Sequence, residues 1–146
     1  MKTGQFNVVQ KEINLPEVTR GCHIITKIIL QSLPELKNFK FGTLNIFLQH
    51  TSASLTINEN VCSDVRSDLE NWMNSAIPEG PHWEHSAEGA DDMPAHIKSS
   101  VMGVSLDIPI NNGSLCLGRW QGIYLNEHRG YGGSRHVVLT IMGTMK

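Results

Sequence analysis

Side chains that can bind metals or transfer protons gather in a few short stretches of this sequence. The densest stretch, residues 82–92, holds two histidines and four acidic residues. Imidazoles beside carboxylates are typical of sites that bind a divalent metal or move protons near neutral pH. The stretches are residues 50–54, 82–92, 94–98, and 118–122 together with 127–129.

Three of the histidines fall on three different expected elements. His50 ends a strand, His85 lies in a loop, and His96 lies in the first turn of a helix. Three neutral imidazoles with an open fourth position form many catalytic zinc sites. No H-E-x-x-H or H-x-H motif is present, so separate surface or hydrogen-bonded histidines remain the alternative. Nearby carboxylates could add ligands or orient the imidazoles: Glu88, Asp91 and Asp92.

Cationic and hydroxyl side chains near these stretches could bind a phosphate group. Lys98, Arg119, Arg129 and Arg135 supply the charge, and Ser52 and Ser54 project from one face of an expected strand. The glycine-rich segment that follows residue 129 could offer backbone N–H groups to an anion, or it could simply form a turn. Neither a Walker loop nor a dinucleotide fingerprint occurs.

Composition excludes several classes of protein. The 146 residues carry 12 Lys and Arg against 14 Asp and Glu, a net charge of −2, so a nucleic-acid-binding module is disfavoured. No apolar run is long enough to span a membrane, and the N-terminus lacks the apolar segment of a signal peptide. Three scattered cysteines indicate neither a disulfide framework nor a zinc ribbon. We therefore expect a cytoplasmic protein.

Alternating apolar and polar residues predict six or seven strands, joined near the C-terminus by short turns. The dipeptide Asn112-Gly113 predicts a tight hairpin turn. Such short turns favour antiparallel pairing. Strands are expected at residues 6–15, 44–48, 53–57, 104–110, 115–125 (as one or two strands) and 135–142.

Three helices are expected from apolar residues three and four positions apart. The first covers residues 24–33. The second follows a proposed N-cap at Ser63 and places Trp72 in the core, and the third runs from about Pro94 to Met102. Strands and helices do not alternate regularly, which argues against a parallel doubly wound sheet. We expect one α+β domain over residues 1–146, with an antiparallel β-sandwich-like core and about three helices.

Four motifs make the sequence similar to the YjbQ family, whose members are known as secondary thiamine-phosphate synthases. The similarity follows the family's order and spacing and extends over essentially the whole chain. The motifs are residues 48–60 (LQHTSASLTINEN), 85–98 (HSAEGADDMPAHIK), 120–123 (WQGI) and 127–129 (EHR). One departure is Arg119, where family members often have threonine.

The resemblance implies a sandwich-like α+β fold, a homotrimer with sites near subunit boundaries, and a metal site made of His50, His85 and His96. Zinc is the first choice of metal and magnesium the alternative. The expected catalytic groups are Glu88, Asp91, Asp92 and Glu127. The expected substrate-binding and anion-binding groups are Ser52, Ser54, Lys98, Arg119, Gln121 and Arg129.

Three functions are compatible with these residues. The first is weak thiamine-phosphate synthesis, which joins hydroxymethylpyrimidine diphosphate to thiazole phosphate with release of diphosphate. The second is metal-dependent hydrolysis of a small phosphorylated or acyl metabolite, with Glu88 or Glu127 as the general base. The third is a non-catalytic trimer that binds a metal or a small metabolite. The expected partners are therefore further copies of this chain and a small phosphorylated molecule, with no nucleic acid and no membrane.

Overall fold

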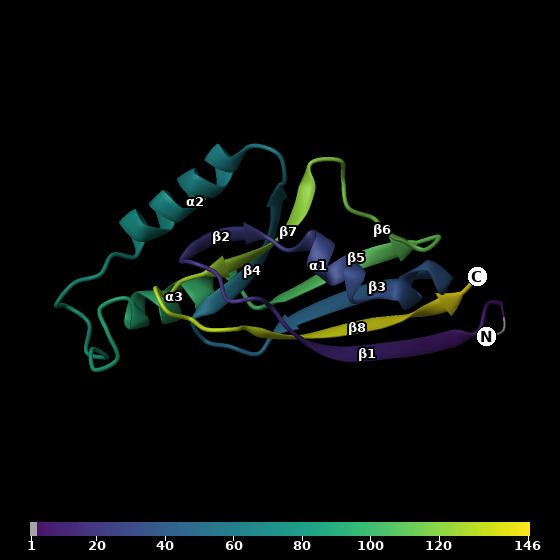
Figure 1. Ribbon diagram of the computed structural model, residues 1–146, viewed down its shortest axis with the longest axis horizontal. Helices are drawn as coiled ribbons and strands as arrows, with labels where there is room; N and C mark the ends of the chain where they lie inside the picture. The colour runs from purple at the N-terminus through teal and green to yellow at the C-terminus, as the bar shows by residue number, and fades with distance from the viewer. Residues whose placement is uncertain (1–2) are drawn as a thin grey trace.

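Eight strands form two antiparallel sheets in the computed structural model of this protein, which describes residues 3–146 (Figure 1). The larger sheet has the order β1-β8-β3-β5-β6, and the smaller has the order β2-β7-β4. This arrangement confirms the expected α+β class with an antiparallel core. The strands are β1 (Phe6–Asn14), β2 (Gly21–Ile24), β3 (Phe39–Leu48), β4 (Ala53–Glu59), β5 (Ser105–Asn111), β6 (Ser114–Leu115), β7 (Gln121–Glu127) and β8 (His136–Met145).

The core lies between the two sheets and takes alternate residues from their strands. In β8, Val137, Leu139 and Ile141 are fully buried, and Ile141 pairs with Leu44 on β3. The alternation follows from the pleat of a strand, which turns successive side chains to opposite faces. Leu55 of β4 and other buried residues of the smaller sheet belong to the same hydrophobic cluster.

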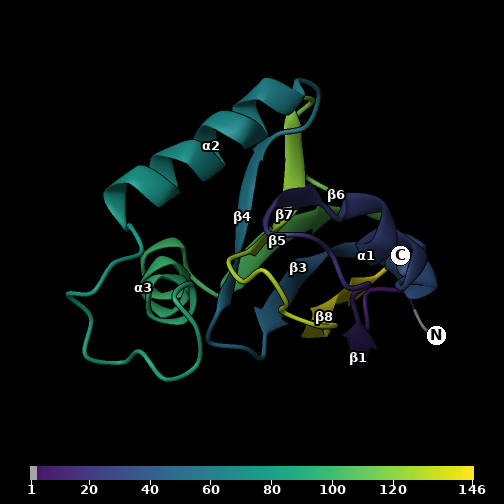
Figure 2. The ribbon, with the colours of Figure 1, turned by 60° about the vertical axis from the view of Figure 1, so that its left-hand side comes forward.

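Four helical segments complete the fold: α1 (Thr26–Gln31), the 3₁₀ helix η1 (Pro34–Asn38), α2 (Ser63–Ala76) and α3 (Asp92–Met102). Figures 1 and 2 show α2 and α3 together at one end of the molecule, and α1 and η1 over one face of the larger sheet. In these described residues no helix is both long and apolar enough to cross a membrane.

Two helix boundaries differ from the sequence prediction. Residues 24 and 25 do not begin the first helix. Ile24, the last residue of β2, pairs with Tyr124 of β7, and the Ile25 N–H donates to the Ile123 carbonyl. Ser63 is the first residue of α2 rather than its cap, and no side chain caps the helix there. Pairing with a neighbouring strand is a long-range effect that helical periodicity does not register.

The prediction that Trp72 lies in the core is also wrong. Its side chain is 57% exposed on α2, whereas the neighbouring Met73 is buried. The apolar side of α2 is wider than the side that packs against the rest of the fold, so some of its apolar residues stay exposed.

Candidate metal centre

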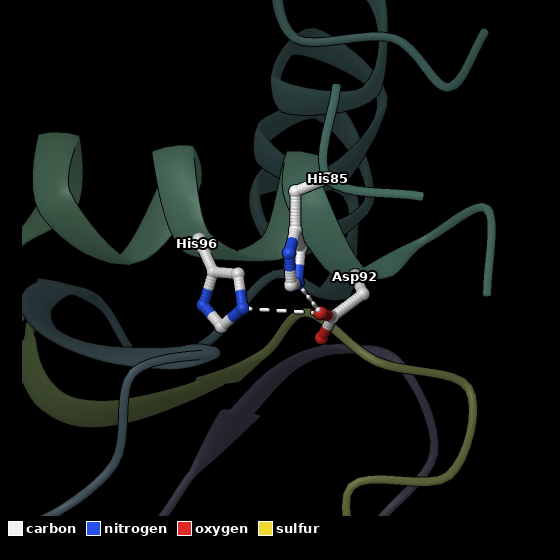
Figure 3. Close-up of side chains that lie close together, drawn as sticks. All are labelled: His85, Asp92 and His96. Carbon is white, nitrogen blue, oxygen red and sulfur yellow. Dashed lines mark hydrogen bonds and ion pairs between the residues drawn. The ribbon is translucent and has the colours of Figure 1, made fainter. Parts of the chain in front are cut away.

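His85, Asp92 and His96 bring three potential ligand atoms within 4.8 Å of one another (Figure 3). The Nε2 atom of His85 lies 2.7 Å from Oδ2 of Asp92, and the Nε2 atom of His96 lies 3.1 Å from the same oxygen. Two imidazole nitrogens and one carboxylate oxygen form a donor set that suits zinc better than magnesium, which prefers oxygen ligands alone.

Helix α3 positions two of the three side chains. Asp92 and His96 are four residues apart, a spacing that places side chains on the same face of a helix. Asp92 is the first residue of the helix, where the dipole favours a negative charge. His85 comes from the preceding loop, which returns toward the helix where Asp92 N–H donates to the Gly89 carbonyl.

The two carboxylate oxygens of Asp92 have separate partners. Oδ1 accepts a hydrogen bond from Nη1 of Arg129 at 2.5 Å, and Oδ2 faces both histidines. Burial by itself would raise the pKa of Asp92, but the hydrogen bond from His85 and the charges of His96 and Arg129 outweigh it. The pKa of Asp92 is therefore lowered, and the carboxylate is ionised at neutral pH.

A backbone carbonyl orients the ring of His96. Its Nδ1 atom lies 2.8 Å from the Thr51 carbonyl oxygen, which can only accept a hydrogen bond. Nδ1 therefore carries a proton, and in the neutral ring the lone pair is on Nε2, toward Asp92 and His85. Metal-binding histidines are commonly oriented by such a contact. The side chains of His85 and His96 are 45% and 31% exposed, so the cluster is open to solvent on one side.

His50, the third histidine expected to bind metal, does not join this cluster. Its Nε2 atom accepts a hydrogen bond from the backbone N–H of His136, and its Nδ1 atom lies 3.4 Å from Nη1 of Arg135. Burial, followed by the charges of Arg135 and His136, lowers the pKa of His50. His50 nevertheless lines the same cleft of about 500 Å³ as His96.

The four expected catalytic acids have different surroundings, and Asp92 alone joins the cluster. Asp91 accepts a hydrogen bond from Gly130 N–H and pairs with Arg129. Glu88 offers its backbone carbonyl to Arg129. Glu127 is completely buried and bound through both oxygens by Arg135, at 2.8 and 2.6 Å, so it is not free to act as the general base.

The expected anion-binding side chains near the cluster are engaged with other protein groups. Ser52 accepts from Arg135, and Ser54 is buried against His128. Lys98 has no exposed surface and donates to Asn74 on α2 at 2.7 Å. Arg129 holds Asp91 and Asp92, as described above.

Arg119 and Gln121 lie at the other end of β7. Gln121 pairs with Glu59, whereas Glu127, at the end near the cluster, pairs with Ala53. Six residues of extended strand span roughly 20 Å. Within one chain, the structure does not bring these two residues to the histidine cluster. The guanidinium of Arg119 instead lies over the Trp120 ring, 5.0 Å from its centroid.

Two buried side chains outside the expected metal-binding and catalytic groups prove central to this region, and Arg135, expected to bind an anion, instead binds protein groups. Arg135 is 4% exposed and links Glu127, Ser52 and His50. His128 is 1% exposed, with Nε2 2.9 Å from Ser54 Oγ and with no protein partner for Nδ1. Consecutive ionisable residues directly after an apolar strand, at 127–129, were the signal that could have identified His128.

Comparisons with known proteins match this chain to one family. The sequence model of a family described as "UPF0047 protein YjbQ-like" matches residues 11–144. The YjbQ protein of Salmonella typhimurium is 50% identical over 134 residues, which cover 92% of this chain and 97% of the relative. The YjbQ protein of Escherichia coli O157:H7 is 47% identical with the same coverage.

Solved structures show the same fold. A YjbQ/UPF0047 protein from Clostridium acetobutylicum superposes with a TM-score of 0.80 at 36% identity, covering 90% of this chain and 98% of that one. A protein from Sulfolobus solfataricus gives a TM-score of 0.84 at 24% identity, covering 95% and 99%.

Proposed function

Because this chain belongs to the YjbQ-like UPF0047 family, we propose that it is a metal-dependent enzyme for a small phosphorylated metabolite, built around His85, Asp92 and His96. The observation that carries the proposal is that the two carboxylate oxygens of Asp92 have different partners. Arg129 occupies one carboxylate oxygen, while the other oxygen and two imidazole nitrogens converge on one point open to solvent.

Zinc is the proposed metal, with magnesium as the less suitable alternative. When bound, it would supply positive charge to a phosphate oxygen or lower the pKa of a water molecule. The protein residues orient the ligands and the substrate. The Thr51 carbonyl orients the ring of His96, and Arg129 binds Oδ1 of Asp92, which leaves Oδ2 facing the two histidines. The cleft lined by His50, Thr51, Ser99 and His96 is the proposed binding place for the substrate.

The first candidate reaction is thiamine-phosphate synthesis, which the family resemblance implies. The thiazole ring nitrogen would form a bond to the methylene carbon of the pyrimidine, and the carbon–oxygen bond to diphosphate would break. Diphosphate leaves with the bonding electron pair. The protein's task in this reaction is to position the two rings and to neutralise the leaving group.

Hydrolysis of a phosphate ester is the second candidate. It is favoured because the cationic side chains near the site are already bound to other protein groups. Lys98, Arg129 and Arg135 all hold other protein groups, so one chain presents few free charges for a diphosphate. Hydrolysis requires attack by one water oxygen on phosphorus and departure of the alcohol. Of the expected bases, the exposed Glu88 is still available, whereas Glu127 is buried.

Self-association into a trimer is also proposed. The face of the larger sheet turned away from the core exposes apolar side chains, whereas α1 and η1 pack on the core side (Figure 1). An exposed apolar patch of this kind is typical of protein interfaces. Its members are Phe6, Val8, Phe41, Phe47 and Met142.

A cytoplasmic location is the remaining proposal. The cysteines Cys22, Cys62 and Cys116 are all free thiols. Free thiols without disulfides are typical of a reducing compartment.

We expect His85→Ala and His96→Ala each to lose bound zinc, measured by elemental analysis after dialysis. Removal of either side chain leaves only two of the three converging ligand atoms. His82→Ala is the matched control, because His82 lies on the same loop but contacts Trp83 rather than the cluster. It should retain the zinc content of the wild type.

The same proteins test the reaction. Wild type and His82→Ala should form thiamine phosphate from the two substrates, or release inorganic phosphate from a panel of phosphate esters, and His96→Ala should do neither. Synthesis without hydrolysis selects the first reaction, and the reverse selects the second. Absence of both products from zinc-loaded or magnesium-loaded wild type would contradict the proposed enzyme.

Met142→Glu is expected to lower the assembly mass from about three times the chain mass of 16.2 kDa toward that of one chain. Met142 is 51% exposed and pairs with Val8 across the two strands, so the substitution places a charge inside the apolar patch. Light scattering after size exclusion measures the mass. Val101→Glu on α3, exposed but outside the patch, should not change it. A monomeric wild type would rule out the trimer.

A further inference from the structure

A buried ion pair between Glu127 and Arg135 contacts residues that hold the histidine cluster without belonging to it. Glu127 is 0% exposed and Arg135 is 4% exposed, and two hydrogen bonds of 2.8 and 2.6 Å join them. A bidentate pair of this type fixes both side chains in one geometry. Because the interior is a medium of low dielectric constant, the pair is also hard to break.

One contact path leads from this pair to His96. Nη2 of Arg135 donates to the carbonyl oxygen of Ser52 at 3.1 Å and to its hydroxyl at 2.9 Å. The preceding residue, Thr51, supplies the carbonyl that accepts from Nδ1 of His96. Arg135 therefore holds the short connection between β3 and β4 in the position that orients His96.

A second path leads from the pair to Asp92. The Oε2 atom of Glu127 accepts a hydrogen bond from the backbone N–H of Arg129 at 3.1 Å. The guanidinium of Arg129 then contacts Oδ1 of Asp92 and the carbonyl oxygen of Glu88. The backbone contact with Glu127 therefore fixes the main chain at Arg129, from which the guanidinium group reaches Asp92 and Glu88.

The backbone of the β7–β8 connection is packed directly against the same pair. A Cβ atom at Gly132 would collide with the Glu127 carboxylate, including both of its oxygens. At Gly130, in contrast, a Cβ would meet only Oδ2 of Asp91, at 3.7 Å, which is an ordinary contact. Gly132 thus offers a way to displace Glu127 without changing any charge.

From these contacts we infer that Glu127 and Arg135 are positioning residues, which set the ring of His96 and the carboxylate of Asp92 from one buried hub. The inference rests on the proposed metal site for its functional consequence. It assigns to Glu127 a role different from that of a general base. Neither hub residue touches the proposed substrate cleft.

The test uses Arg135→Lys, which keeps the positive charge but loses the planar fork that reaches Glu127 and Ser52 together. Gly132→Ala is the second variant, with Gly130→Ala as its control. Ile141→Val, a truncation in the core far from the hub, controls for a general loss of stability. The first measurement is the Nδ1–H resonance of His96 in ¹H–¹⁵N spectra of the metal-free proteins. The second is zinc affinity, measured by competition with a chromophoric chelator.

Wild type, Gly130→Ala and Ile141→Val should show the hydrogen-bonded Nδ1–H resonance, and Arg135→Lys and Gly132→Ala should lose it. Zinc affinity should fall roughly 10- to 100-fold in the latter two variants, the range found for residues that orient metal ligands. An unchanged resonance together with unchanged affinity in Arg135→Lys would overturn the inference, as would absence of the resonance from wild type. Should wild type bind no zinc while the resonances behave as expected, the proposed metal site fails and the positioning role stands.

Discussion

Replacement of Asp92 by asparagine is expected to lower the affinity for zinc roughly 100-fold. Zinc sites with four ligands bind with about 10–16 kcal/mol, so one ligand is worth about 3 kcal/mol, or about two powers of ten. The substitution also removes the negative charge of the carboxylate that faces both His85 and His96. Arg129 keeps its contact with Asp91, so the loop that carries it should stay in place.

Zinc affinity by competition with a chelator measures the effect, and circular dichroism confirms that the variant is folded. Asp107→Asn is the control, because Asp107 is an exposed carboxylate on β5 whose partner is Asn45. It should bind zinc as wild type does. If Asp92→Asn kept wild-type affinity, the metal would have to be held elsewhere, and the proposed centre would be wrong.

The largest expected effect on stability comes from acidification and acts through His128. Burial, followed by the charges of Lys98 and Arg135, lowers the pKa of His128 to about 3 in the folded protein. An unfolded chain binds the proton near pH 6.5, so its proton uptake favours unfolding at every pH between these two values. This contribution to stability is complete above pH 6.5 and falls as the pH is lowered. At pH 4.5 the loss should be about 3 kcal/mol, at about 1.4 kcal/mol for each pH unit.

Urea unfolding of metal-free protein at pH 7 and pH 4.5 measures this loss. His128→Gln cannot be protonated in this range, so its unfolding free energy should decrease by about 3 kcal/mol less than that of wild type. His82→Gln is the control, since His82 is exposed in its loop. An equal decrease in His128→Gln and wild type would show that His128 does not cause the acid sensitivity.

Local sequence patterns predicted most of the regular structure. Alternation in residues 53–57 predicted β4, and the helix predicted from about Pro94 matches α3, which begins two residues earlier at Asp92. The Asn112-Gly113 turn is present, with positive φ angles of 48° and 82° that suit these two residues. These features depend on residues close together in the sequence, so a local pattern is sufficient to find them.

The errors arise where distant segments compete with a local preference. Ile24 fits a helical pattern but pairs with β7, because a strand partner more than ninety residues away satisfies its backbone. Trp72 fits the apolar side of α2 but remains exposed. Periodicity indicates which face of an element is apolar, and it does not indicate how much of that face the rest of the chain covers.

For the candidate site, the sequence by itself determined the donor types, the four-residue spacing that joins Asp92 to His96, and the membership of the family. Tertiary structure decided the rest. It brought His85 to α3, placed His50 where it accepts a hydrogen bond from the backbone N–H of His136, and buried Glu127 against Arg135. The physical reason is that each of these outcomes depends on how the β3–β4 and β7–β8 connections pack against α3. Spacing along a helix is a local property of the chain, whereas the partner of a loop side chain is chosen only when the sheets have assembled.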